Sequence, residues 1–258
     1  MVKIAGGTPK ILPTSPDSGL KITPQQLQNN ITDKTRLLIL NSPSNPTGVL
    51  YSKEDLEGLA EVIVKNNIFV ISDEIYEELI YDVKEYTSPA SLGKEIYDLT
   101  FTVNGVSKAY SMTGWRIGYA AGPEEVIGYV KKLQDHSTSC PSSISQAAAV
   151  AALSLPKSDV AKMRDEFHVR RDLMMKLLDG LDEISYIRPG GAFYMFCDIS
   201  KLGDSFDVAS RILNDAKVAF IPGEGFGAPG YARLSFATSE AKIEEGIKRI
   251  AAWIKNNS

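Results

Sequence analysis

Three short apolar runs in the first half of the chain constrain its fold most strongly. Residues 37–40, 68–72 and 99–103 are rich in Leu, Ile, Val and Phe, and each is followed by a polar segment and then a helix or loop. Apolar strands that alternate with helices are typical of a mostly parallel sheet covered on both faces. Parallel crossovers bring the carboxyl ends of these strands to one edge. We therefore expect an α/β fold in which the residues after each strand lie close together.

Polar residues follow each run at the point where the predicted strand ends. Asn45 follows the first, Asp73 and Tyr76 follow the second, and Lys108 follows the third. The lysine is unusual, because lysine is depleted in strands and normally extends into water. In open α/β sheets ligands bind outside the carboxyl ends of the strands, and a partly desolvated lysine there can attack a carbonyl group as a nucleophile. The four side chains are predicted to converge on one site.

Four segments occur in the order found in one enzyme family. They read NSPSNPTG at residues 41–48, SDEIY at 72–76, SKAYSMTGWRIG at 107–118 and YARLSFA at 231–237. Together they resemble the fold-type I aminotransferases of class I/II, the aspartate aminotransferase family, over essentially the whole chain. The resemblance implies the mostly parallel sheet of a pyridoxal-phosphate-dependent transferase large domain, followed by a smaller α+β domain. It also implies pyridoxal 5′-phosphate as cofactor.

The resemblance assigns cofactor-binding roles to the residues at the strand ends. Lys108 would hold pyridoxal phosphate covalently and then move a proton as general base and acid. Asp73 would pair with the protonated pyridine nitrogen, and Tyr76 and Asn45 would donate hydrogen bonds to the phenolic oxygen of the ring. Taken alone, Lys108 reads as a surface lysine, Asp73 as a helix cap and Asn45 as a turn residue.

Two arginines are expected to bind anionic groups. Arg116 would bind the cofactor phosphate, because a planar guanidinium donates two parallel charge-assisted hydrogen bonds. Arg233, in an otherwise apolar run, would pair with the α-carboxylate of an amino acid. The resemblance also assigns Asn45 to substrate binding. The alternative for Arg116 is a solvated arginine at a strand end.

The function implied by the resemblance is transfer of an amino group between aspartate and 2-oxoglutarate, by an enzyme that is a homodimer in its full-length form. Another enzyme of the same fold, such as a carbon–sulfur lyase, is an alternative, because Lys108 and Asp73 serve any reaction through a Cα carbanion. A non-catalytic fragment or an assembly partner is a further alternative.

One large departure from the family affects these expectations. Family members carry a segment ahead of the point where this chain begins, with the first strand of the large sheet, a phosphate-binding turn and an aromatic residue that stacks on the cofactor. Position 105 is Gly where some relatives have a phosphate-binding Ser. We expect unpaired strand edges and exposed apolar surface, and poor cofactor binding, or none, by this chain alone.

The two domains are expected at residues 1–165, a partial large domain that binds the cofactor, and 166–258, a small C-terminal domain. A helical pattern at 158–181 is long enough to connect them. Further strands are predicted at residues 2–5, 10–12 and 218–221. The glycine-rich run at 223–227 is interpreted as a mobile loop over the substrate site.

Composition excludes several classes of partner. Lys and Arg number 28 against 32 Asp and Glu, which argues against a nucleic-acid surface. No apolar run approaches the roughly 18 residues of a membrane helix and no signal peptide is recognisable, so we expect a cytoplasmic protein with no membrane partner. Cys140 and Cys197 are expected as reduced thiols, and no metal site is predicted. His168 is expected on a solvated helix face.

Overall fold

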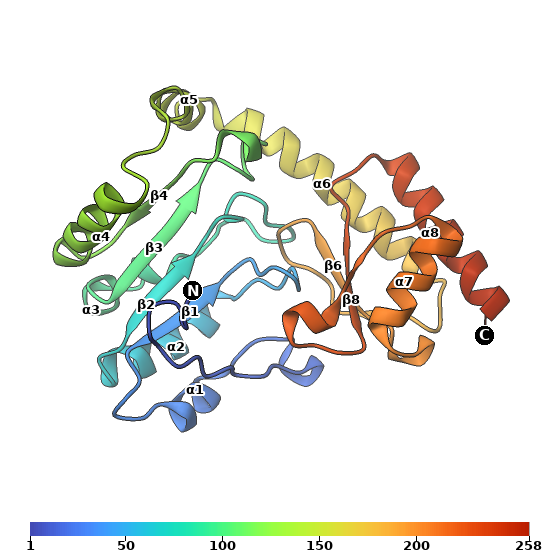
Figure 1. The fold of residues 1–258 in the computed structure, drawn as a ribbon, viewed down its shortest axis with the longest axis horizontal. Coiled ribbons are helices and arrows are strands. Elements are labelled where there is room, and N and C mark those ends of the chain that lie inside the picture. The colour runs from blue at the N-terminus through green and yellow to red at the C-terminus, as the bar shows by residue number, and fades with distance from the viewer. Residues whose placement is uncertain (258) are drawn as a thin grey trace.

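Two four-stranded sheets form the framework of the chain in the computed structural model, which describes residues 1–257 (Figure 1). In the first sheet the order is β1 (Leu37–Asn41), β2 (Phe69–Asp73), β3 (Thr100–Gly105) and β4 (Gly118–Ala121), with β1 to β3 parallel and β4 antiparallel. The second sheet is antiparallel, in the order β5 (Ser185–Tyr186), β6 (Tyr194–Asp198), β8 (Tyr231–Ser235) and β7 (Ile221–Pro222). The predicted mostly parallel sheet and following α+β unit are confirmed.

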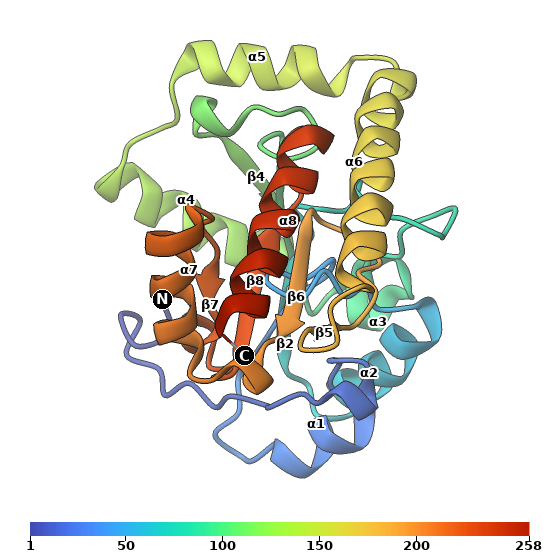
Figure 2. The same cartoon turned by 90° about the vertical axis from the view of Figure 1, so that its right-hand side faces the viewer.

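Eight α-helices surround these sheets within residues 1–257. They are α1 (Pro24–Asn30), α2 (Lys53–Lys65), α3 (Lys94–Tyr97), α4 (Glu124–Ser137), α5 (Ser143–Leu153), α6 (Lys157–Leu178), α7 (Ser205–Ala216) and α8 (Glu240–Asn257). The long α6 leads from the first sheet to the second (Figures 1 and 2). The expected boundary between residues 165 and 166 falls inside this helix and stays a prediction.

Local sequence signals explain where two of the helices begin. The Thr23 hydroxyl accepts a hydrogen bond from the Gln26 amide, and Pro24 occupies the first turn of α1, where a missing amide hydrogen costs nothing. Ser52 and Asp55 cap each other's backbone amides at the start of α2. Thr before Pro, and Ser followed three residues later by Asp, are sequence patterns that predict both helix starts.

The predicted strands at residues 2–5 and 10–12 are wrong. The segment forms a turn in which the Ala5 amide donates to the Met1 carbonyl and the Gly7 amide donates to the Val2 carbonyl. Because these backbone groups are used locally, they are not available to a neighbouring strand. The strand predicted at 218–221 is displaced and begins at Ile221.

The main apolar core lies in the second half of the chain. Side chains from α6, α7 and α8 pack against β6 and β8, and the fully buried members include Leu178, Met195, Ile212, Phe236 and Ile250. Burying one such side chain stabilises a fold by about 1.5–3 kcal/mol. A second cluster joins α1 and α2 to one face of the first sheet through Leu27, Leu59 and Val70. The two cores give each sheet its own support.

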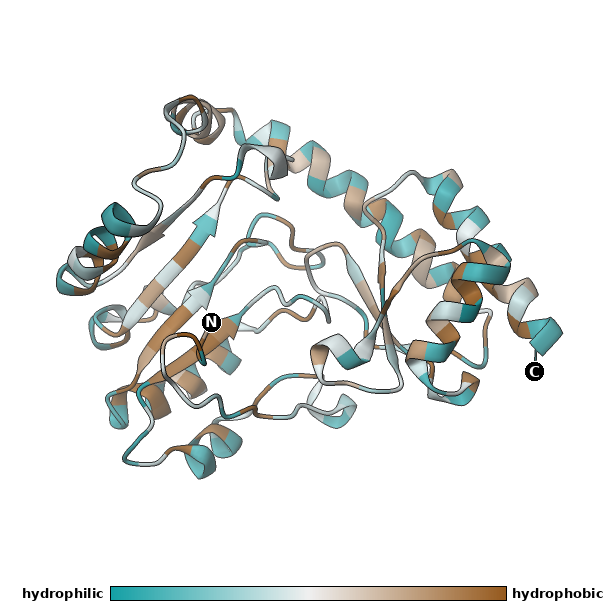
Figure 3. Ribbon diagram, in the orientation of Figure 1, coloured by the Kyte–Doolittle hydropathy of each residue, from teal (hydrophilic) through white to brown (hydrophobic). Residues whose placement is uncertain are grey.

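The other face of the first sheet is not covered, contrary to the expectation of helices on both faces. Leu37, Ile39 and Phe69 are 42%, 46% and 44% exposed, and the register places Leu37 beside Phe69 on that face. All of β4 is exposed, and α4 has no buried residue. Figure 3 shows β1 and β2 as largely hydrophobic strands. The expected exposed apolar surface is confirmed.

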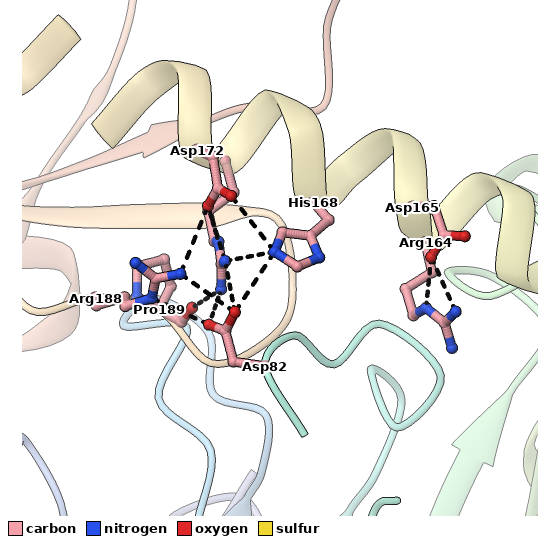
Figure 4. A network of polar contacts seen from close by, with 8 residues as sticks. Asp82, Arg164, Asp165, His168, Asp172, Arg188 and Pro189 are labelled. Atoms are coloured by element: carbon pink, nitrogen blue, oxygen red, sulfur yellow. Dashed lines mark hydrogen bonds and ion pairs between the residues drawn. The ribbon is translucent and has the colours of Figure 1, made fainter. Parts of the chain in front are cut away.

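An ion-pair network fastens the segment after β2 to the second half of the chain (Figure 4). Arg171 of α6 is fully buried and donates to both carboxylate oxygens of Asp82, at 2.6 and 3.1 Å. Arg188 donates to the same carboxylate at 3.0 and 3.2 Å, and Arg171 also donates to the Pro189 carbonyl. His168 lies at the solvated edge of this network: its side chain is 38% exposed, and its Nε2 lies 2.8 Å from an Arg171 nitrogen.

Residues 1–257 can be compared with the expectations for membrane-spanning helices, metal ligands and cysteines. Among residues 1–257, every helix is too short or too polar to span a lipid bilayer. The same residues contain no group of three His, Cys, Asp or Glu side chains placed to ligate a metal. Cys140 is exposed and Cys197 is buried, and both are free thiols.

We expect Ile39→Lys to reduce self-association without loss of stability. The side chain is already about half exposed, so its replacement should change the free energy of unfolding by less than about 0.5 kcal/mol. Light scattering and binding of a hydrophobic dye measure the exposed face. Gln25→Lys adds the same charge on α1 and serves as control. Undiminished dye binding by Ile39→Lys would contradict this interpretation of the face.

Asp82→Asn should destabilise the fold in a pH-dependent way. The Arg171 and Arg188 guanidinium groups hold the pKa of the Asp82 carboxyl well below its usual range. The ionised carboxylate therefore stabilises the folded state fully above about pH 4, and this contribution declines as the pH falls further. Because Asp82 is partly exposed, we expect a loss of about 2 kcal/mol at pH 7 rather than the larger cost of a fully buried pair.

Thermal unfolding of both forms between pH 7 and pH 3 measures this effect, and the two curves should converge towards low pH. Asp98→Asn removes the partner of Lys94 in an exposed pair on α3 and provides a matched control with a cost below about 1 kcal/mol. A difference at pH 7 that persists unchanged at pH 3 would rule out the carboxylate charge as the cause.

Candidate active site

The carboxyl ends of β1 and β2 lie side by side and form one part of the candidate site. Asn41 pairs with Asp73 in the parallel register, and the Asn41 amide nitrogen donates to the Asp73 carbonyl at 3.1 Å. The Asn45 backbone amide in turn donates to the Asn41 side-chain oxygen at 2.8 Å. The turn after β1 is thus held against the end of β2, which fixes the position of Asn45.

Lys108 follows β3 and lies over two aromatic rings. Its Nζ is 5.6 Å from the centre of the Tyr76 ring and 5.5 Å from that of Phe193. No hydrogen bond or ion pair joins this amine to any of residues 1–257. Burial lowers the pKa of Lys108, and the positive charges of Arg116 and Arg233 lower it further. The environment thus shifts the equilibrium towards the neutral amine, which is the nucleophilic form.

Arg233 reaches the site from β8 of the second sheet. Its Nη1 donates to the Asn45 side-chain oxygen at 2.7 Å. The guanidinium carbon lies 4.4 Å from the ring centre of Tyr194 and 5.1 Å from that of Phe226. Its Nε is buried and has no hydrogen-bond partner among residues 1–257. A planar guanidinium held in this way can bind a carboxylate by donating hydrogen bonds to its oxygens.

Tyr76 is buried beneath Lys108, and its hydroxyl lies 3.0 Å from the Tyr194 hydroxyl. Burial raises the pKa of Tyr76 far above its ordinary value, and the hydrogen bond with Tyr194 raises it further. Tyr76 therefore keeps its proton throughout the ordinary pH range and is able to donate a hydrogen bond.

Asp73 ends β2 with its side chain about half buried. Burial raises the pKa of this carboxyl, although its Oδ1 accepts a hydrogen bond from the Ile75 amide at 3.3 Å. No α-helix begins here, since the chain continues through a turn, and the alternative of a helix cap is wrong. A half-buried carboxylate with so little compensation is suited to a cationic partner.

Arg116 lies beyond the direct contacts of the other candidates. It is exposed, takes the left-handed conformation with φ 49°, and donates from Nη1 to the Thr113 carbonyl at 2.7 Å. Gly105 is closely packed, because a Cβ there would lie 3.1 Å from the Gly118 Cα and 3.2 Å from the Ile117 carbonyl oxygen. A serine at position 105 would require β3 and β4 to separate.

The sequence analysis missed three aromatic residues of the site. Phe193 directly precedes β6, Tyr194 is its first residue, and Phe226 ends the short helix at Gly223–Phe226. Aromatic and apolar residues at 193–198 are typical of a buried strand, so the sequence has no signal that sets Phe193 and Tyr194 apart as site residues. The glycine-rich run is anchored by the Ser205 hydroxyl, which donates to Glu224, and it places Phe226 on Arg233.

Comparisons with known proteins agree with this arrangement. The family model described as aminotransferase class I and II matches residues 1–250. An aspartate aminotransferase from Bacillus sp. strain YM-2 is 45% identical over 260 residues, which cover 98% of this chain and 66% of that protein. A probable aspartate/prephenate aminotransferase from Aquifex aeolicus is 42% identical, over 96% of this chain and 65% of that protein.

Solved structures give the same result. The aromatic aminotransferase from Pyrococcus horikoshii superposes with a TM-score of 0.95 at 40% identity, over 99% of this chain and 69% of that chain. The aspartate aminotransferase from Rhizobium meliloti superposes with a TM-score of 0.95 at 41% identity, over 100% and 67%. The chain thus spans about two thirds of the length of the relatives it matches.

Removal of the Arg116 charge should raise the pKa of Lys108. In Arg116→Leu the neutral fraction of the amine at a given pH decreases, so an amine-specific reagent should modify Lys108 several-fold more slowly at neutral pH. Peptide mass analysis across a pH series measures the rate. Arg249→Leu removes a charge from α8 and should leave the rate unchanged. Equal rates in Arg116→Leu and the unchanged chain would contradict the electrostatic effect.

Proposed function

Because this chain belongs to the aminotransferase class I and II family, whose members depend on pyridoxal phosphate, we propose that it carries the reactive lysine of an enzyme that transfers an amino group between an amino acid and a 2-oxo acid. The observation that carries the proposal is the unpartnered Lys108 amine, held over Tyr76 with a lowered pKa. A lowered pKa increases the fraction of neutral amine, which is the form that attacks carbonyl groups.

The residues present fit pyridoxal phosphate by their chemistry. The Lys108 amine and the Arg233 Nε have no partner among residues 1–257, and the half-buried Asp73 carboxylate has a single weak one. These groups match the aldehyde of the cofactor, an anionic substrate group and the pyridine nitrogen, respectively. When bound, pyridoxal phosphate supplies an aromatic system that takes up the electron pair left at Cα when its proton departs.

Each side chain would have its own role with the cofactor bound. Lys108 would remove and return the proton at Cα, and Asp73 would keep the pyridine nitrogen protonated through its negative charge. Tyr76 and Asn45 would donate hydrogen bonds to the ring oxygen, and Arg116 would bind the phosphate.

Arg233 binds the α-carboxylate, and Asn45 orients the guanidinium through the 2.7 Å hydrogen bond. Since β8 carries Arg233 while the first sheet carries Lys108, substrate binding joins the two halves of the chain.

Aspartate and 2-oxoglutarate are the substrates we propose, on the basis of the aspartate aminotransferases among the relatives. For the whole protein we also propose a homodimer and a cytoplasmic location, as the resemblance to the family implies. The relative from Pyrococcus horikoshii is an aromatic aminotransferase, so an aromatic amino donor is the competing outcome. Product analysis with each donor separates these, and release of ammonia or sulfide instead of amino transfer would indicate the carbon–sulfur lyase.

Capture of pyridoxal phosphate by Lys108 tests the proposal directly. Added pyridoxal phosphate followed by borohydride reduction should leave the group covalently on Lys108 in preference to the exposed lysines, because this amine is partly desolvated and has no hydrogen-bond or ion-pair partner among residues 1–257. Since the chain spans about two thirds of its relatives, we expect most of the absorption to be lost on desalting before reduction. Peptide mass analysis identifies the modified lysine.

Lys108→Ala should lose this adduct, whereas Lys242→Ala, at an exposed position of α8, should retain it. Modification spread evenly over the surface lysines of the unchanged chain would refute the proposed function. Retained colour after desalting, seen only with Lys108, would show that the site is complete in this chain.

A further inference from the structure

Tyr194 contacts two residues of the candidate site, Arg233 through its ring and Tyr76 through its hydroxyl. It comes from β6, is 7% exposed, and lies between Arg233 of β8 and Tyr76 after β2. No role follows for it from the reaction described above.

The ring of Tyr194 supports the Arg233 guanidinium. The cation lies 4.4 Å from the ring centre, closer than the 5.1 Å to Phe226 on a separate loop. An aromatic face attracts a guanidinium electrostatically, and the attraction grows when water is excluded. With Asn45 bonded to Nη1, the ring restricts rotation of the guanidinium plane and leaves its remaining donors in place for a carboxylate.

The hydroxyl of Tyr194 meets the Tyr76 hydroxyl at 3.0 Å. Each hydroxyl can donate one hydrogen bond and accept others, so a proton given by Tyr194 leaves that of Tyr76 free to be donated elsewhere. Hydrogen bonds in such a chain polarise one another and strengthen the outer donor. Tyr76 lies beneath Lys108, where that donor is used.

We propose that Tyr194 is a positioning residue that aligns Arg233 for carboxylate binding through its ring and strengthens Tyr76 as a hydrogen-bond donor through its hydroxyl. The proposal rests on the proposed function. It assigns alignment of Arg233 to the ring of Tyr194 and strengthening of Tyr76 to its hydroxyl. If Tyr194 only filled the core, its replacement would change folding, but loss of the ring and loss of the hydroxyl would not have these two different effects.

Carboxylate binding without cofactor tests the ring. Maleate, a dicarboxylate that has no amine to react, is titrated calorimetrically into the chain. Tyr194→Leu should bind it about tenfold more weakly, while Tyr194→Phe keeps the ring and should bind within about twofold of the unchanged chain. Tyr186→Phe removes a hydrogen-bonded hydroxyl elsewhere in the second sheet and is the matched control. Circular dichroism confirms that each variant is folded.

Three results would overturn the role of the ring. These are no maleate binding by the unchanged chain, equal binding by Tyr194→Leu, or an equal loss in Tyr194→Phe and Tyr194→Leu. Should Tyr194→Leu fail to fold, an undiminished affinity in Tyr194→Phe together with a loss in Arg233→Leu supports the proposal, and a loss in Tyr194→Phe overturns it.

A pH titration of the absorption spectrum with excess pyridoxal phosphate tests the hydroxyl. When the group formed by Lys108 and pyridoxal phosphate loses its proton, more negative charge lies on the ring oxygen that Tyr76 would stabilise. A weaker hydrogen bond from Tyr76 therefore makes this loss of the proton less favourable. Tyr194→Phe should raise the pH midpoint of the absorption change by about half a unit, and Tyr186→Phe should not. An unchanged midpoint in Tyr194→Phe would overturn the role of the hydroxyl.

The two proposals fail in different ways. If Lys108 captures no pyridoxal phosphate, the proposed function fails and the hydroxyl role falls with it, whereas the maleate titration still decides the role of the ring. If Lys108 is modified but neither Tyr194 variant differs from the control, the function stands and the positioning role is wrong.

Discussion

The pairing of Arg171 with Asp82 is the interaction on which the rest of the arrangement depends. It joins the segment that leaves β2 to the long helix α6, and the helix continues into the sheet that carries Arg233. The guanidinium is fully buried, so its removal would leave the Asp82 carboxylate with Arg188 as its remaining arginine partner and a gap inside the fold. By holding the two sheets at a fixed separation, this pair lets an arginine from one sheet meet an asparagine from the other.

Aromatic side chains fill the junction created by this pair. Tyr76, Phe193 and Tyr194 pack mainly edge to face or tilted, with ring centres 4.7–5.9 Å apart. Such packing combines large buried area with few rotatable bonds, so the polar atoms at its margin are held with little freedom. The lowered pKa of Lys108 has the same origin, because the rings that exclude water offer the amine no counter-ion.

Much of the fold follows from periodicity and caps. The parallel strands and the starts of α1 and α2 could be predicted, since each has a local or topological signal, whereas the contact of Asn45 with Arg233 joins two separate sheets and has none. The failures concern tertiary context. The strands near the N-terminus require a partner that the sequence pattern alone does not specify, and the network that His168 borders joins groups distant in sequence. Tyr194 was missed because a buried aromatic in a strand reads as core until its neighbours are known.

The contact between Gly105 and Gly118 limits how this site can be altered by evolution or design. The two residues face each other across β3 and β4, and a methyl group on either would meet backbone atoms of the opposite strand at 3.1 or 2.9 Å. Backbone cannot rotate aside as a side chain does, so no single codon change adds a hydroxyl at position 105 without disturbing the strand pair. A hydroxyl at position 105 therefore depends on a shift of β4 by a few tenths of an ångström, so Gly105 and Gly118 behave as a coupled pair rather than as two independent positions.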